Sequence, residues 1–207
     1  MDELSRVEMK RIFDASLAGV GLLVSSPLWV LFGAAIKLED GGPIFYTQER
    51  VGLKGCVFNA LKFRSMRVDA EASTGAVQAI ENDPRVTRVG QLMRATAMDE
   101  LPQLWNIFRG DMSFVGPRAL RPGEIESDGG EIVSIDRIPG YTARIHVRPG
   151  LTGIAQIYAP RDVPRRQKFR YDGLYVRRQS MLLDVRLILL SFWISFLGTW
   201  ESRGRKY

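Results

Sequence analysis

An uncharged apolar run near the N-terminus is the strongest hydrophobic pattern in the chain. It extends from Ala15 to Ile36 (ASLAGVGLLVSSPLWVLFGAAI), and its 22 residues exceed the roughly 20 that cross the hydrocarbon core of a bilayer. A cleavable signal peptide has a shorter apolar region, followed by a small-residue cleavage site. The pattern therefore predicts a membrane segment that the protein retains.

Pro27 lies in the middle of this run and predicts a kink, because proline removes one helical hydrogen bond. The carbonyl of Leu23 loses its donor there, and Ser25 or Ser26 can supply a replacement. Basic residues flank both ends, so the positive-inside rule does not place the ends on opposite sides. They are Arg6, Lys10, Arg11, Lys37, Arg50 and Lys54. Two arrangements remain open: a kinked spanning helix, or a helix that breaks at Ser26-Pro27 and returns to the same face.

A second apolar stretch closes the chain, but its uncharged part from Leu187 to Trp200 has only 14 residues, which is short for a span. Its pattern predicts an amphipathic helix along the membrane. A buried terminal helix of the core is the alternative. Polar positions share one narrow face and tryptophans suit an interface: Asp184, Ser191, Ser195 and Thr199, with Trp193 and Trp200.

Between these ends the pattern predicts short elements separated by turns. Residues 41–52 (GGPIFYTQERVG) and 57–66 (VFNALKFRSM) predict strands punctuated by glycine and proline. Residues 67–87 predict a short helix and a surface loop, and residues 110–124 a turn-rich connector. Helices are predicted over 90–94 and 99–109, the second admitting Pro102 in its first turn.

Composition narrows the classes of partner and of site. The chain has 207 residues, 45% of them hydrophobic, and a formal net charge of +6, which favours anionic partners. Residues 137–178 carry ten Lys or Arg against two acidic residues, so loops there can turn several guanidinium groups onto a phosphate. The single cysteine and single histidine, Cys56 and His146, exclude a disulfide framework and a Cys- or His-rich metal site, and fit a reducing compartment.

The stretch AMDELPQLWN places two adjacent carboxylates, Asp99 and Glu100, before a run of apolar residues at helical spacing. Acidic residues are common at helix starts, where free N–H groups and the macrodipole stabilise negative charge. On the pattern alone, this capping role is the simpler interpretation.

Several stretches, in this order and spacing, resemble the small monotopic phosphoglycosyl transferases, the bacterial sugar transferases that start surface-glycan assembly. They are KRIFDASLAG with Ser26-Pro27, PIFYTQERVG, FNALKFRSM, DPRVTRVGQLMR, MDELPQLWNIFRGDMSFVGPR, VRPGLTGIAQIY and YDGLYVRRQSMLLDVRLIL. The resemblance implies transfer of a sugar 1-phosphate from a UDP-sugar to undecaprenyl phosphate, with release of UMP. It implies that Asp99 is the nucleophile of a covalent phosphosugar intermediate, that Glu100 is its catalytic partner, and that Mg²⁺ binds at Asp99.

The resemblance also selects cations for the diphosphate and the acceptor phosphate. These are Lys62, Arg64, Arg118 and Arg148, with Arg85 a weaker candidate that can instead pair with Asp83 or Glu81. Members of the family often carry Ser or Thr where this chain has Ala97, which removes a cap from the catalytic helix and leaves Thr96 one residue earlier.

The implied architecture is an α/β fold that is mainly α, with short strands and irregular loops. We expect a re-entrant membrane helix over 1–38 that breaks at Ser26 and Pro27, a catalytic domain over 39–180, and a membrane-associated helix over 181–207. The expected location is the cytoplasmic face of the bacterial inner membrane. Expected partners are UDP-sugar, undecaprenyl phosphate, membrane lipids and a second copy in a homodimer, with no nucleic acid. The alternatives are a non-enzymatic membrane adaptor that binds anionic lipids through its basic segment, and a phosphatase.

Overall fold

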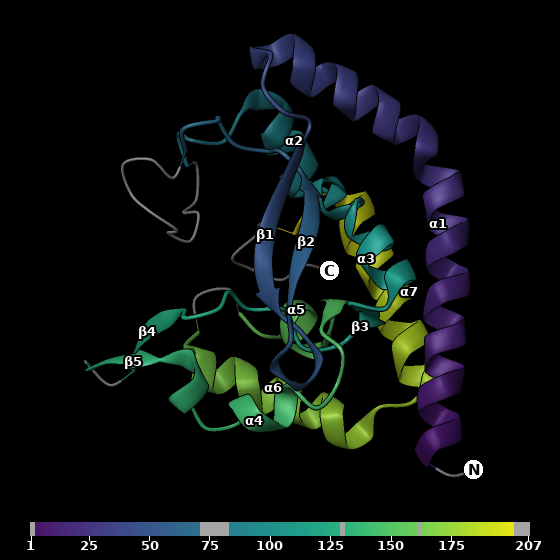
Figure 1. Ribbon diagram of the computed structural model, residues 1–207, viewed down its shortest axis with the longest axis vertical. Helices are drawn as coiled ribbons and strands as arrows, with labels where there is room; N and C mark the ends of the chain where they lie inside the picture. The colour runs from purple at the N-terminus through teal and green to yellow at the C-terminus, as the bar shows by residue number, and fades with distance from the viewer. Residues whose placement is uncertain (1–2, 71–82, 129–130, 161–162, 201–207) are drawn as a thin grey trace.

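The computed structural model describes residues 3–70, 83–128, 131–160 and 163–200. Helix α1, Glu3–Asp40, follows one side of the molecule and then bends across its top (Figure 1). Among the described helices it is the one long and apolar enough to cross a membrane. The apolar run predicted as a membrane segment lies within it.

The bend in α1 is explained by Pro27, which lies inside the helix. The Ser26 hydroxyl donates to the Leu23 carbonyl at 2.8 Å, so the predicted replacement donor is confirmed. The Ser25 hydroxyl instead accepts a hydrogen bond from the Trp29 indole at 3.1 Å. The expected break is therefore a bend within one continuous helix.

Two strands after α1 form an antiparallel ribbon, β1 Phe45–Val51 and β2 Val57–Phe63. A 3-10 turn at Leu53–Gly55 joins them, which confirms the strands predicted on either side of Gly52. Phe63 belongs to a buried apolar cluster that includes residues of α1. The ribbon is thus fixed against the end of α1.

Helices α2, Arg88–Ala95, and α3, Gln103–Arg109, are separated by a 3-10 turn at Met98–Glu100. The prediction of one helix over 99–109 is therefore wrong. A helix beginning at Asp99 requires residue 102 to donate to the Met98 carbonyl, and Pro102 has no N–H. The α-helix begins only after this proline.

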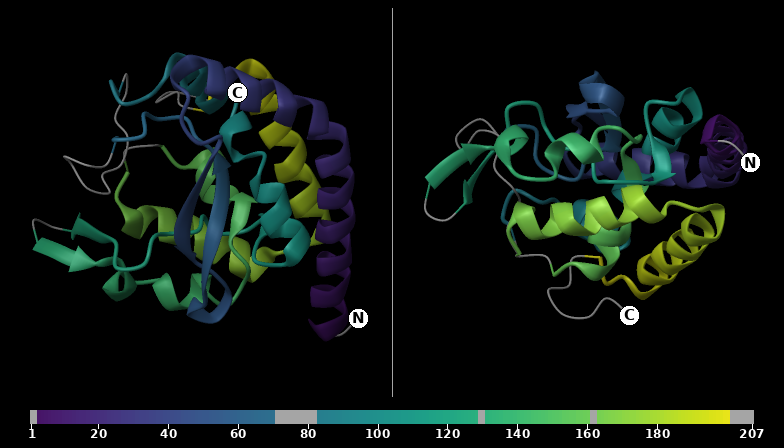
Figure 2. Two further views of the ribbon diagram at one scale, coloured as in Figure 1. Left: turned by 45° about the horizontal axis from the view of Figure 1, so that its top comes forward. Right: turned by 90° about the horizontal axis from the view of Figure 1, so that it is seen from below.

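Two further strand pairs complete the β structure. Strand β3, Ser113–Val115, pairs in parallel with β6, Gly150–Thr152, so the predicted connector over 110–124 contains a buried strand. A Cβ at Gly150 would lie 2.0 Å from the backbone nitrogen of Gly116, and only glycine fits there. Strands β4, Ile125–Asp128, and β5, Glu131–Ser134, form a hairpin that projects from the side opposite α1 (Figure 2).

The remaining elements are helical. They are a 3-10 turn at Ile135–Arg137, α4 Tyr141–Arg144, α5 Ile154–Tyr158, α6 Arg165–Arg178 and α7 Met181–Leu197. The main core joins α1, α3, β3, α5, α6 and α7. The fold is mostly helical with short strands, as expected. The short helix predicted within 67–87 falls largely on 71–82, outside the described residues.

Helix α7 has one side in the core and one side exposed. Leu187 and Ile194 are fully buried, whereas Leu189, Phe192 and Phe196 are exposed. Asp184 lies on the buried side, where it accepts hydrogen bonds from Tyr175 at 2.9 Å and from the Lys10 ammonium at 2.5 Å. The alternative prediction, packing against the core, therefore holds for one side of the helix.

Candidate active site

The two carboxylates of the MDE stretch lie on a tight turn between α2 and α3. The Thr96 hydroxyl donates to the carbonyls of Leu92 and Met93, so it ends α2 and does not cap the next element. Ala97 then adopts a left-handed conformation with φ 56°. As expected from Ala97, no side chain caps the turn that carries Asp99 and Glu100.

Both carboxylates open onto a cavity of about 960 Å³. Its lining is strongly cationic, and this charge favours an anionic ligand. The lining cations are Arg50, Lys62, Arg64, Arg67, Arg94, Arg118, Arg121, Arg144, Arg165 and Lys168. Cations from elements as far apart in the sequence as β1 and α6 thus line the same cavity as Asp99 and Glu100.

Glu100 is held between two cations. Its Oε1 atom lies 2.5 Å from the Lys62 ammonium and 3.5 Å from the Arg118 guanidinium. Burial raises the pKa of Glu100, but Lys62 and Arg118 outweigh this effect and lower the pKa to about 2. Glu100 is therefore an anion at neutral pH.

Asp99 has a different electrostatic environment. Burial raises its pKa to about 6; Lys62 opposes this shift and the neighbouring Glu100 adds to it. Within the described part of the chain, no hydrogen bond to the Asp99 carboxylate is formed. This carboxylate is therefore available to a ligand, whereas that of Glu100 is already engaged.

Two of the predicted cations lie beside the carboxylates, and a third, Arg64, forms an ion pair with Asp40 instead. Lys62 and Arg118 both contact Glu100. Arg64 lines the cavity, but its side chain is buried against the end of α1, where it pairs with Asp40 and donates to the Pro43 carbonyl at 2.6 Å. In this conformation Arg64 anchors α1.

The other two predicted cations are not among the residues that line the cavity. Arg85 pairs with Asp83 at 2.7 Å, which is the local pairing considered from the sequence. Arg148 donates to the Gly110 carbonyl, at the end of α3, with its Nε atom at 2.9 Å. Both guanidinium groups serve local structure here.

The chain matches the family model described as bacterial sugar transferase over residues 5–198. It belongs to the bacterial sugar transferase family. The phosphoglycosyl transferase family predicted from the motifs is thereby confirmed.

Known relatives of this sugar transferase share its sequence over most of the chain. It is 41% identical to an undecaprenyl-phosphate glucose phosphotransferase of Komagataeibacter xylinus, covering 88% of this chain and 35% of the relative. It is 42% identical to a UDP-glucose:undecaprenyl-phosphate glucose-1-phosphate transferase of Caulobacter vibrioides, covering 87% and 67%. It is 34% identical to the galactosyl transferase CpsE of Streptococcus agalactiae, covering 94% and 44%. The chain thus spans between a third and two thirds of these proteins.

The sequence interpretation missed Arg50 as a site residue of this sugar transferase, assigning it to the membrane flank. Arg50 donates to the Ala119 carbonyl at 2.9 Å. Burial, with Arg118 and Arg121 nearby, lowers its pKa to about 10. Strand alternation could have identified it, because Arg50 lies two positions from Gln48 and four from Tyr46, and all three line the cavity.

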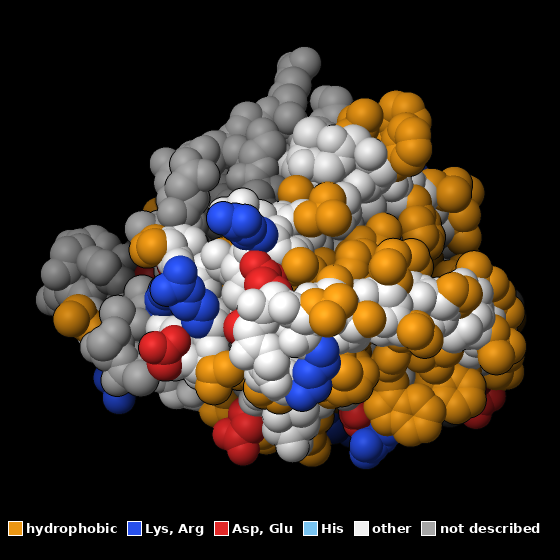
Figure 3. Space-filling view, turned by 90° about the horizontal axis from the view of Figure 1, so that it is seen from above, with side chains coloured by type: hydrophobic (Ala, Val, Ile, Leu, Met, Phe, Trp, Pro, Cys, Tyr) orange, Lys and Arg blue, Asp and Glu red, His pale blue; other side chains and the backbone are white. Residues whose placement is uncertain are grey.

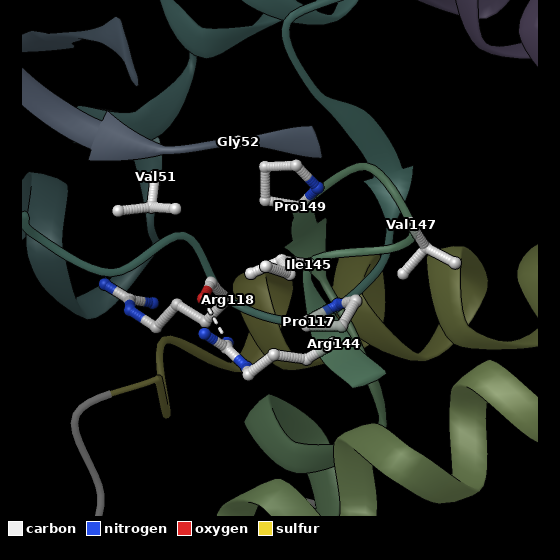
Figure 4. A pocket seen from close by; sticks show the side chains of 8 residues that line it. All are labelled: Val51, Gly52, Pro117, Arg118, Arg144, Ile145, Val147 and Pro149. Carbon is white, nitrogen blue, oxygen red and sulfur yellow. Dashed lines mark hydrogen bonds between the residues drawn. The ribbon is translucent and has the colours of Figure 1, made fainter. Parts of the chain in front are cut away.

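A buried ion pair beneath Arg118 was also missed. The Arg144 guanidinium lies 3.1 Å from the Asp172 carboxylate and stacks over the Phe169 ring at 4.7 Å. It also donates to the Arg118 carbonyl, as the dashed line in Figure 4 shows. Arg144 comes from α4 and Asp172 from α6. No local pattern could indicate this pair, because the partners lie 28 residues apart on different helices.

The donor set determines which metal this sugar transferase can hold. The described residues contain no group of three or more His, Cys, Asp or Glu side chains suited to a metal. Mg²⁺ needs few protein ligands when substrate phosphates and water complete its shell. The uncommitted Asp99 carboxylate in this cation-lined cavity therefore fits Mg²⁺ only if phosphate oxygens and water complete its shell.

Proposed function

We propose that this protein transfers a sugar 1-phosphate from a UDP-sugar to undecaprenyl phosphate and releases UMP. The observation that carries the proposal is the uncommitted Asp99 carboxylate at a cation-lined cavity, beside a Glu100 that two cations hold. The names of the relatives support the two substrate classes. They differ in the sugar, glucose or galactose, so the donor has to be measured.

In the first step an ionised Asp99 oxygen attacks the phosphorus next to the sugar. A bond forms between this oxygen and the phosphorus, and the bond from that phosphorus to the bridging oxygen breaks. The bridging oxygen leaves with UMP, and a phosphosugar remains on Asp99. Phosphoryl transfer depends mainly on in-line positioning and charge neutralisation, which the surrounding cations supply.

In the second step an oxygen of undecaprenyl phosphate attacks the same phosphorus. The acyl phosphate bond breaks, Asp99 is regenerated as a carboxylate, and a polyprenyl diphosphate sugar is formed. Glu100 remains ionised and cannot donate a proton at neutral pH. Its role in the proposal is to orient Lys62 and Arg118 toward the diphosphate.

Mg²⁺ is the proposed cofactor, and Asp99 is the residue that would hold it. When bound, it neutralises charge on the transferring phosphoryl group. Because the protein supplies so few ligands, Mg²⁺ binding should require the nucleotide. Calorimetric titration of the protein with Mg²⁺, with and without UDP-sugar, measures this dependence directly.

The contacts of α1 support a re-entrant membrane anchor. Before the apolar run, Lys10 and Asp14 bind Asp184 and the Phe114 amide. After the run, Glu39 accepts from the Arg88 amide at 2.7 Å, and Asp40 pairs with Arg64. Both flanks therefore bind the same domain, and a straight span would separate them. We place this domain on the cytoplasmic face of the bacterial inner membrane, with the exposed side of α7 at the lipid interface.

The test is UMP release from a panel of UDP-sugars in the presence of Mg²⁺, with and without undecaprenyl phosphate. One sugar should give acceptor-dependent release. Without acceptor, the intact protein should gain the mass of one sugar phosphate. Asp99→Asn should abolish both signals while the protein stays folded and membrane-bound.

The matched control is Asp136→Asn, which removes an exposed carboxylate outside the cavity. This variant should behave like the wild type. Turnover by Asp99→Asn at the wild-type rate would contradict the covalent mechanism. An absence of UMP release with every sugar would favour the membrane adaptor, and release that does not depend on acceptor would favour a phosphatase.

A further inference from the structure

The cavity at Asp99 is also lined by apolar side chains. They come from three helices: Leu17, Val24 and Leu28 of α1, Leu104 of α3, and Ile188 and Phe192 of α7. Leu17, Leu104 and Ile188 belong to one apolar cluster. We call the surface formed by these side chains the apolar groove. It lines the same cavity as the carboxylates and the cations, so a single ligand can contact all of them.

The hydroxyl groups beside the apolar groove each have a hydrogen-bond partner in the protein. Ser25 accepts from Trp29 at 3.1 Å, and Ser195 accepts from Trp200 at 2.7 Å. Ser191 lies 2.6 Å from the Thr152 hydroxyl and also bonds to the Leu187 carbonyl. Because these groups already bond within the protein and the other walls are apolar, the groove favours hydrocarbon over a sugar or a base.

The apolar groove continues onto the exposed apolar surface. Val24 is 75% exposed and Phe192 is 65% exposed although both line the cavity. Figure 3 views the molecule from above. Hydrophobic side chains gather mainly on the right of this view, and most Lys, Arg, Asp and Glu side chains lie on the left and along the lower edge. A ligand in the groove can thus extend into the membrane that surrounds α1.

We propose that the apolar groove binds the isoprenoid chain of the polyprenyl phosphate acceptor where it joins the phosphate. This inference rests on the proposed transferase function. A polyprenyl phosphate combines an anionic head with a hydrocarbon tail, which matches a cavity that is lined both by cations and by the apolar groove. The groove directs the phosphate toward Asp99 and leaves the distal isoprene units in the lipid.

The test compares two phenylalanines on α7. Phe192 lines the cavity, whereas Phe196, one turn further along and 82% exposed, does not. In nanodiscs, Phe192→Ala should raise the KM for undecaprenyl phosphate about tenfold, as expected for one lost aromatic contact. Phe196→Ala should leave this KM unchanged. With geranyl phosphate, which keeps the two isoprene units next to the phosphate that the groove is proposed to hold, the effect of Phe192→Ala should persist.

A matched pair on α1 tests the same groove by filling it. Val24 lines the cavity and Leu23 does not, yet their exposures are 75% and 77%. Val24→Trp should raise the acceptor KM, and Leu23→Trp should leave it at the wild-type value. Equal effects of the two members of each pair would overturn the proposal.

The donor half-reaction separates this inference from the proposed function. UMP formation and mass gain without acceptor should be normal in all four variants, because the proposal assigns the groove to the acceptor and this half-reaction does not use the acceptor. If the wild type forms no UMP and gains no mass without acceptor, the proposed transferase function is refuted. Cross-linking of a photoreactive polyprenyl phosphate to α1 or α7 should be suppressed by undecaprenyl phosphate and not by phosphatidylglycerol. Equal suppression would show that the groove holds bulk lipid, and would overturn the proposal.

Discussion

At the scale of single residues, Glu100 differs from Asp99 because only the Glu100 carboxylate forms ion pairs, with Lys62 and Arg118. Glu100→Gln removes the negative charge between Lys62 and Arg118. We expect the two cations to separate from their present positions and turnover to fall by about 10²-fold, the usual cost of a small misplacement at an active site. Steady-state kinetics should show the loss, and Glu49→Gln, an exposed carboxylate on β1, should not.

The same substitution has a second readout in the pH profile. The negative charge of Glu100 raises the pKa of Asp99, so Glu100→Gln should shift the acidic limb of the profile to lower pH. A merely structural role for Glu100 would reduce the rate without moving this limb.

The raised pKa of Asp99 predicts the pH dependence of the wild type. Only the ionised carboxylate is a nucleophile, and its pKa of about 6 lies above the ordinary value for Asp, about 4. The rate of UMP formation without acceptor should therefore be constant above neutral pH and decline as the pH falls through about 6. A rate that stays constant down to pH 4.5 would exclude Asp99 as the titrating group.

At the scale of elements, the ion pair between α4 and α6 fixes the backbone of Arg118. Asp172→Asn leaves the Arg144 guanidinium buried without its counterion, which costs about 3–5 kcal/mol. Thermal unfolding should register this loss, and the donor KM should rise because Arg118 is less well held. Arg109→Gln, which breaks an exposed pair at 3.8 Å, should cost less than about 1 kcal/mol.

The double variant Arg144→Met with Asp172→Met separates stability from positioning. An apolar pair of similar volume avoids an uncompensated buried charge, so stability should largely return. The donor of the hydrogen bond to the Arg118 carbonyl is still missing, so the donor KM should stay high. Recovery of both properties would show that the pair acts on stability alone.

These elements also show what the sequence could predict. Strands 45–51 and 57–63 and the kink at Pro27 follow from local patterns, and Asp99, Glu100, Lys62 and Arg118 follow from the motifs. The predicted start of α3 at Asp99 is wrong because a helix beginning there needs an N–H at residue 102, which Pro102 does not have. Arg144 and Asp172 could not be found, because their pairing depends on how α4 packs on α6, which no local pattern specifies.

At the scale of the whole molecule, α1 determines the topology. Its charged flanks contact one domain on both sides of the apolar run, so both should lie on the same side of the membrane. Cys56 is exposed on the turn between β1 and β2 and reports the side of the domain. Ser5→Cys in a Cys56→Ser background reports the N-terminal flank.

A membrane-impermeant maleimide should label both cysteines in inside-out vesicles and neither in intact cells with a permeabilised outer membrane. Labelling of the Ser5→Cys variant from the outside, with Cys56 still labelled only from the inside, would establish a spanning helix. Pro27→Leu restores the helical N–H donor to Leu23 and favours a straight α1. A straight α1 cannot keep the ion pairs of both flanks with one domain. In the Pro27→Leu variant, the fraction of Ser5→Cys labelled from the outside should therefore be higher than in the same protein with Pro27.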